Sequence, residues 1–286
     1  MFADLHIHMI LDGVYYRAAI DSHKAAPRDD LIHSRLAEYR RRGITFLRDG
    51  GDAWGVGLRA RELAGEYGID YRTPAFPIHC RGHYGAFIGR GFSDWEEYRR
   101  LLEEVREKRG DFIKLMISGI IDFNQSDTLS EEGIDPDTIC RMIVLAREAG
   151  FEVMVHANGD KAVNAAIDAG AASVEHGFFL SGATLERLAA SGILWVPTLS
   201  AVGDLIGCGR YPDEVLRPML RQQQERIAAY VQAGGLLGLG SDAGAYQVFH
   251  GKGAADEYGF LRQALGETTD AVLRRGEVYV REKFKN

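Results

Sequence analysis

Short stretches typical of β-strands alternate with longer amphipathic stretches along the 286-residue chain. This alternation constrains the fold strongly, because consecutive β-α units require right-handed crossovers and a parallel sheet. We predict eight strands: Ala3–His8, Ile44–Arg48, Arg72–Ile78, Phe112–Met116, Glu152–His156, Ser173–Glu175, Leu194–Pro197 and Leu236–Gly240. Eight units, with no GxGxxG motif after the first strand, favour a (β/α)8 TIM barrel over an open, doubly wound α/β sheet.

The stretches between the predicted strands have the spacing of helices with one buried face. In Asp94–Arg109 and Pro136–Ala149, apolar residues recur three and four positions apart. Glycines, which tolerate the left-handed backbone of a helix end, stand before several strands: Gly43, Gly68, Gly110, Gly150, Gly170 and Gly192. Beyond residue 266 the pattern is weaker, and we predict a helix over Thr268–Arg275 and an edge strand over Glu277–Arg281.

The composition agrees with a single domain over residues 1–286, since 46% of the residues are hydrophobic and 26% are charged. The net charge of −7 argues against a nucleic-acid-binding surface. The three cysteines, Cys80, Cys140 and Cys208, lie far apart, without the CxxC spacing of a redox or zinc motif. No apolar run has the length of a membrane span, and the N-terminal segment lacks the pattern of a signal peptide. We therefore expect a cytoplasmic protein without nucleic-acid or membrane partners.

Histidines and one acidic residue stand at the predicted C-terminal ends of strands, where TIM-barrel enzymes place their active sites. His6 and His8 are two positions apart and so face the same side of the first strand. Lys114 lies among apolar neighbours, where a charged amine is costly to bury without a partner. The other candidates are His156, His176 and Asp242. Each alone could be a core histidine or a capping aspartate, but together, at five strand ends, they indicate a divalent metal site.

A series of short motifs contains these residues in the same order. They are DLHIH at Asp4–His8, GITFLRDGG at Gly43–Gly51, RGHYG at Arg81–Gly85, IKLMISG at Ile113–Gly119, VHANGDKAVNAAIDAG at Val155–Gly170, SVEHG at Ser173–Gly177, VPTLS at Val196–Ser200 and GSDAG at Gly240–Gly244. From residue 3 to about residue 265, the sequence resembles the amidohydrolase superfamily, in particular its imidazolonepropionase- and prolidase-like branch.

This resemblance implies a binuclear metal centre. The implied ligands are His6, His8 and Asp242 for the more buried metal, and His156 and His176 for the second. Lys114, carboxylated on its amine by carbon dioxide, would bridge the two metals. Burial favours this modification, because desolvation lowers the pKa of the amine and leaves it neutral. Imidazole and carboxylate ligands suit zinc, with manganese, iron and nickel as alternatives.

The resemblance also implies a reaction. It is hydrolysis of an amide-type C–N bond, in a dipeptide, an N-acyl amino acid or a cyclic amide, by a hydroxide that bridges the metals. Asp242 would accept the proton and pass it to the leaving nitrogen. His83 and Tyr84, after the third strand, and His250, beyond the eighth, are the polar candidates for contact with this small-molecule substrate. For the two histidines, an exposed loop position is an equally good interpretation.

The chain departs from the family pattern in two places. Relatives usually carry a flanking β-sandwich, which we expect this chain to lack, so its tail would cover an edge or a neighbouring subunit of a homo-oligomer. Ile120 stands where relatives commonly have glycine. An alternative function is a phosphotriesterase- or lactonase-like ester hydrolase with the same binuclear site. A deaminase would normally lack Lys114 and carry a glutamate shortly after His156. The third alternative is a barrel that binds metal without catalysis.

Overall fold

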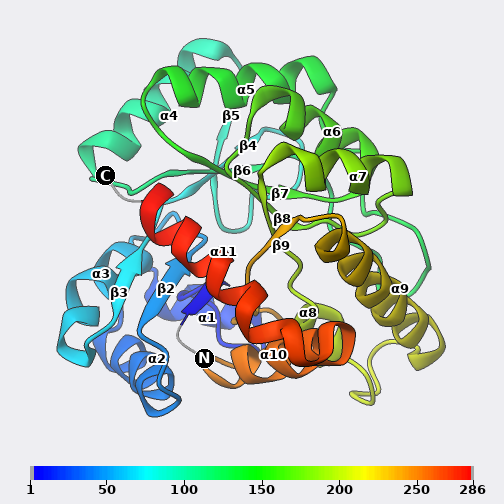
Figure 1. Cartoon of the computed structure of the whole chain (residues 1–286). Helices are drawn as coiled ribbons and strands as arrows, with labels where there is room; N and C mark the ends of the chain where they lie inside the picture. The colour runs from blue at the N-terminus through cyan, green and yellow to red at the C-terminus, as the bar shows by residue number, and fades with distance from the viewer. Residues whose placement is uncertain (1–2, 285–286) are drawn as a thin grey trace.

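The computed structural model describes residues 3–284 and shows a ring of parallel strands surrounded by helices (Figure 1). One hydrogen-bonded group contains β1 (Ala3–Ile7), β2 (Phe46–Asp49) and β3 (Asp70–Arg72). The other contains, in spatial order, β10 (Leu236–Leu237), β9 (Leu194–Val196), β8 (Ser173–His176), β7 (Val153–Ala157), β6 (Ile113–Met116), β4 (Pro77–Cys80) and β5 (Arg90–Phe92). The segment after β10 closes the ring against β1, where the N–H of Leu5 donates to the carbonyl of Leu239 at 2.8 Å. The predicted α/β barrel is confirmed.

The third predicted strand, Arg72–Ile78, is interrupted in the structure, so the prediction of one continuous strand is wrong. Its first residue, Arg72, is the last residue of β3, which pairs with β2. Its last two residues, Pro77 and Ile78, belong to β4, which pairs with β6. Between them, Pro74 has no N–H for a ladder, and Ala75 has a φ of 68°, which turns the backbone out of the strand. The ring remains continuous because the N–H of Asp52 donates to the Ala75 carbonyl at 3.1 Å.

Helices cover the outside of the barrel (Figure 1). They are α1 (Tyr16–His23), α2 (Asp29–Arg41), α3 (Val56–Ala64), α4 (Trp95–Glu107), α5 (Pro136–Glu148), α6 (Gly159–Ala169), α7 (Gly182–Ser191), α8 (Ser200–Gly203), α9 (Asp213–Gln232) and α10 (Lys252–Leu265), with 3-10 turns at Gly65–Tyr67 and Gly266–Thr268. The carboxylates of Asp94 and Asp135 accept hydrogen bonds from N–H groups in the first turns of α4 and α5. Within residues 3–284, no helix combines the length and the apolar composition needed to cross a membrane.

The last helix, α11 (Thr269–Lys283), lies across one opening of the barrel (Figure 1). The predicted edge strand Glu277–Arg281 is therefore wrong. Three buried residues, Val272, Gly276 and Val280, are four positions apart, so a helix places them on one face. Gly276 allows this helix to approach the barrel closely, because a Cβ at this position would collide with the carbonyl oxygen of Leu237.

Apolar side chains fill the barrel beneath α11. The cluster consists of Ala3, Leu5, Phe46, Phe112, Met154, Ala172, Leu194, Val196, Val280 and Phe284. Most of these residues stand at the beginnings of strands, so the cluster closes the N-terminal end of the barrel. The ring of Phe284 lies 5.2 Å from that of Phe112, between their centroids. The polar residues of the predicted site lie at the opposite, C-terminal end of the barrel.

Candidate metal centre

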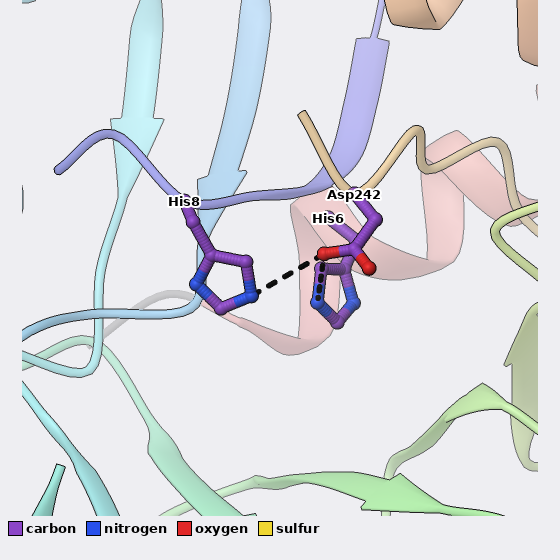
Figure 2. A group of neighbouring side chains, drawn as sticks. All are labelled: His6, His8 and Asp242. Atoms are coloured by element: carbon purple, nitrogen blue, oxygen red, sulfur yellow. Dashed lines mark ion pairs between the residues drawn. The ribbon is translucent and has the colours of Figure 1, made fainter. Parts of the chain in front are cut away.

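The end of β1 and the segment after β10 bring His6, His8 and Asp242 together, as Figure 2 shows. One ligand atom of each residue lies within 4.8 Å of the other two. Asp242 Oδ1 is 3.6 Å from His6 Nε2 and 3.4 Å from His8 Nε2. Within residues 3–284, His6 Nε2 is buried without a hydrogen-bond partner. Two imidazoles and a carboxylate, with one imidazole nitrogen buried and without a hydrogen-bond partner, are a donor set that fits a divalent metal ion.

A buried network holds the segment that carries Asp242. The N–H of Asp242 donates to the His6 carbonyl at 2.8 Å, so the two metal-ligand candidates are joined through the backbone. Next to it, the N–H and hydroxyl of Ser241 donate to the Asp4 carboxylate at 2.8 and 2.6 Å. Asp4 is part of the DLHIH motif, but the sequence analysis assigns it no role. It joins the first and last barrel strands directly behind the candidate ligands.

Glu175 determines the orientation of the His6 ring. His6 Nδ1 donates to Glu175 Oε2 at 2.7 Å, which leaves Nε2 with its lone pair directed toward Asp242. The other oxygen of Glu175 accepts from Arg48 at 2.8 Å and from Ser173 at 2.5 Å. Burial lowers the pKa of His6 well below its ordinary value, so the ring is neutral, as a metal ligand must be.

Replacing Glu175 by glutamine should affect both metal binding and stability. The amide oxygen can still accept a hydrogen bond from His6, but the negative charge opposite the fully buried Arg48 is lost. We expect a 10–100-fold loss of metal affinity, measured by competition with a chelating dye. The free energy of unfolding in urea should fall by about 3–5 kcal/mol, because a buried charge loses its partner.

A matched control is Glu152→Gln, since Glu152 pairs with Lys283 at the surface. This variant should change the free energy of unfolding by less than about 1 kcal/mol and leave metal affinity unchanged. Metal affinity of wild-type strength in a folded Glu175→Gln protein would show that Glu175 does not position His6.

The other two histidines lie next to this group. The ring centroid of His176 is 4.9 Å from that of His6 and 4.5 Å from that of His156. His156 Nε2 lies 3.2 Å from the Gly119 carbonyl, so it is the protonated nitrogen and Nδ1 keeps its lone pair. His176 Nδ1 is 2.7 Å from the hydroxyl of Thr198, which leaves Nε2 for a ligand. Burial is the main reason why the pKa of His156 falls to about 3. Burial also lowers the pKa of His176 well below its ordinary value.

Lys114 is a buried amine without a hydrogen-bond partner in the described part of the chain. Its side chain lies on β6, with 1% of its surface exposed. Burial is the main reason why its pKa falls from 10.5 to about 8. A positive charge on Lys114 lowers the pKa of His6 and that of His156, in each case as the second cause after burial. An unpaired amine of lowered pKa inside the barrel has the properties that carboxylation requires.

A cavity of about 460 Å³ opens above the histidines at the C-terminal end of the barrel. His8, His156, His176 and Asp242 contribute to its floor, together with apolar and aromatic residues of the surrounding loops. Tyr84, one of the predicted substrate contacts, lines the cavity, and its ring centroid lies 4.9 Å from that of His156. Burial raises the pKa of the Tyr84 hydroxyl, so this group stays protonated and can donate a hydrogen bond.

The two other predicted substrate contacts lie outside the described lining of this cavity. His83 is partly exposed, with Nδ1 3.3 Å from Glu131 Oε1. His250 is buried, and both ring nitrogens are occupied: Nδ1 lies 3.0 Å from the Tyr39 hydroxyl, and Nε2 lies 2.8 Å from the Leu11 carbonyl. This geometry gives His250 a structural role, in which it ties the loop after β1 to α2.

Comparison with known proteins gives a family for the sequence. A model of the amidohydrolase family matches residues 2–284. An uncharacterized protein of Mycobacterium bovis is 32% identical over 143 residues, which are 48% of this chain and 38% of that protein. Ochratoxinase of Aspergillus niger is 28% identical over 148 residues, which are 51% of this chain and 28% of the enzyme. The matched part is less than half the length of either relative.

Solved structures share the fold over nearly the whole chain. A Xaa-Pro dipeptidase with methionine in its active site has a TM-score of 0.75 at 18% identity, covering 98% of this chain and 74% of that one. The A. niger ochratoxinase structure has a TM-score of 0.77 at 20% identity, covering 97% and 70%. A prolidase in complex with N-methylphosphonate-L-proline has a TM-score of 0.73 at 22% identity, covering 98% and 73%. At these identities, the likeness establishes a common fold.

Proposed function

The chain belongs to the amidohydrolase family, and from this premise we propose that it is a metal-dependent hydrolase that cleaves an amide-type C–N bond in a small molecule. The proposal treats residues 1–286 as one hydrolase domain. The observation that carries it is the group of His6, His8 and Asp242, in which the buried Nε2 atom of His6 has no hydrogen-bond partner among the described residues.

Two divalent metal ions fit the donors at the floor of the cavity. His6, His8 and Asp242 would hold the first, and His156 and His176 would hold the second through the nitrogens that their hydrogen bonds leave free. A carboxylated Lys114 would supply the oxygens between them. When bound, zinc or a similar ion would lower the pKa of water and polarise the substrate carbonyl.

The side chains would carry out the remaining tasks of the reaction. The Asp242 carboxylate faces the cavity, where it can accept a proton from the attacking water and return it to the leaving nitrogen. The protonated hydroxyl of Tyr84, beside His156, can donate a hydrogen bond to a substrate oxygen. The apolar lining of the cavity would exclude bulk water and so strengthen both interactions.

A substrate screen with the zinc- or manganese-loaded protein tests this proposal. Dipeptides, N-acyl amino acids and cyclic amides should be hydrolysed in preference to lactones and phosphotriesters. Treatment with a chelator should reduce the rate by about 100-fold or more, because the contribution of the metal to the transition state is several kcal/mol, and added zinc should restore it.

The screen also separates the alternatives. Preferential turnover of lactones or phosphotriesters would replace the amide hydrolase by an ester hydrolase with the same metal centre. Stoichiometric metal without turnover of any substrate class would favour a barrel that binds metal without catalysis.

A further inference from the structure

Among its described lining residues, the cavity above the candidate metal centre contains one arginine, Arg210, and no lysine. The acidic group of this lining, Asp242, lies close to His6 Nε2 and His8 Nε2. Arg210 is exposed, and it has no acidic side chain within ion-pair distance in residues 3–284, so its guanidinium brings an unpaired positive charge to the lining of the cavity. Such a group is a ready binding partner for an anion.

Two tyrosines hold Arg210 in place. Its guanidinium carbon lies 4.5 Å from the ring centroid of Tyr246 and 5.2 Å from that of Tyr211. Both tyrosines also line the cavity. Stacking on aromatic rings restricts the side chain, while no side-chain N–H of Arg210 donates a hydrogen bond within residues 3–284. This restriction reduces the entropy lost when the planar guanidinium binds a carboxylate.

Several of the other lining residues are also aromatic. The ring of Tyr211 packs against that of Phe123, with the two centroids 5.1 Å apart. A second series leads from the histidines to the mouth, through Tyr84, Phe87 and Tyr16, with centroid distances of 5.6 and 5.7 Å. At the mouth, Tyr16 keeps 41% of its surface exposed, although it faces an apolar neighbour. These rings offer a large surface to an apolar group of a ligand.

We propose that Arg210 binds the carboxylate of the substrate, and that the aromatic side chains of the cavity bind a large apolar or aromatic group of the same molecule. The inference deepens the proposed function, since it gives the amide substrate the character of a hydrophobic acid, such as an N-acyl amino acid or a dipeptide with an apolar side chain. Arg210 is then a specificity residue. It binds the end of the substrate that does not react.

A pair of ligands without a hydrolysable bond tests the proposal independently of any turnover. Binding of 4-phenylbutanoate and of 4-phenylbutan-1-ol to the metal-loaded protein is measured by NMR titration. The two ligands share the aromatic ring and differ in the carboxylate. The wild-type protein should bind the acid about 10–100-fold more tightly than the alcohol, the factor that a charge-assisted hydrogen bond provides. If hydrolysis is absent while this preference holds, the proposed reaction fails and the binding site stands.

The variant Arg210→Gln should weaken binding of the acid by about the same factor and leave binding of the alcohol unchanged. Arg210→Lys should retain part of the preference, because it keeps the charge and loses the planar fork. The control is Arg141→Gln, which removes an exposed arginine stacked on Trp95 at 4.2 Å, outside the cavity lining. It should leave both affinities unchanged. Equal affinity of the wild-type protein for acid and alcohol, no binding of the acid, or undiminished binding of the acid by Arg210→Gln would each overturn the proposal.

Discussion

Asp242→Asn should reduce kcat by about 10²–10⁴-fold while the substrate still binds. Asparagine keeps the size of the side chain and an oxygen directed toward His6 and His8, but it cannot accept the proton of the attacking water. The backbone of Asp242 supports this geometry, because its φ of 61° is a conformation that asparagine tolerates well. The variant should therefore fold normally and lose the chemical step rather than the shape of the cavity.

Metal content must be measured with the kinetics, because the loss of charge also weakens a ligand. Steady-state kinetics and elemental analysis on the same preparation separate the two effects. A matched control is Asp94→Asn, which replaces the carboxylate that caps α4 by an equally good cap outside the cavity lining. Wild-type turnover in fully metallated Asp242→Asn protein would reduce Asp242 to a ligand, and another group would have to carry the proton.

The sequence predicts that His6, His8 and Asp242 lie together, because the fold itself brings them to one end of the barrel. Once eight β-α units are accepted, the C-terminal ends of the strands must meet, and residues as distant as His6 and Asp242 become neighbours. The argument that singled out Lys114, a charged residue among apolar neighbours, also applies to two residues behind the candidate ligands. Arg48 and Glu175 are also charged residues inside apolar strands, and the same argument of costly burial, applied to them, predicts their pairing.

Other features could not be predicted because they depend on tertiary contacts. The role of His250 follows from Tyr39, a residue far away in the sequence, and nothing around His250 indicates this partner. The C-terminal segment has a pattern that suits both an edge strand and a helix over a few residues. Packing of Gly276 against the barrel favours the helix. The break in the third strand was partly predictable, since Pro74 cannot donate to a ladder, but the φ of Ala75 was not.

Lys114→Ala should remove at least one metal ion and lower kcat by about 100-fold or more, since even groups that only support a ligand contribute 10–100-fold. The physical reason lies in the surroundings of the amine. It is buried, it has no partner within residues 3–284, and its pKa of about 8 leaves a substantial neutral fraction near pH 7.5. A neutral amine can add carbon dioxide, forming an N–C bond and releasing a proton, and the product is an anion that two cations would stabilise.

Three measurements distinguish this bridge from an ordinary buried lysine. The intact mass under native conditions should exceed the sequence mass by one carbon dioxide, and acid should remove the excess. Short carboxylates such as formate should partly restore the activity of Lys114→Ala, because they can occupy the space that the side chain leaves. Lys114→Met, which keeps the packing of β6, should be as stable as the wild-type protein in the absence of metal and equally inactive, and formate should not rescue it. Full activity and full metal content in either variant would contradict the bridging role, since an amine that only fills the barrel can be replaced by an apolar side chain of similar volume at little cost.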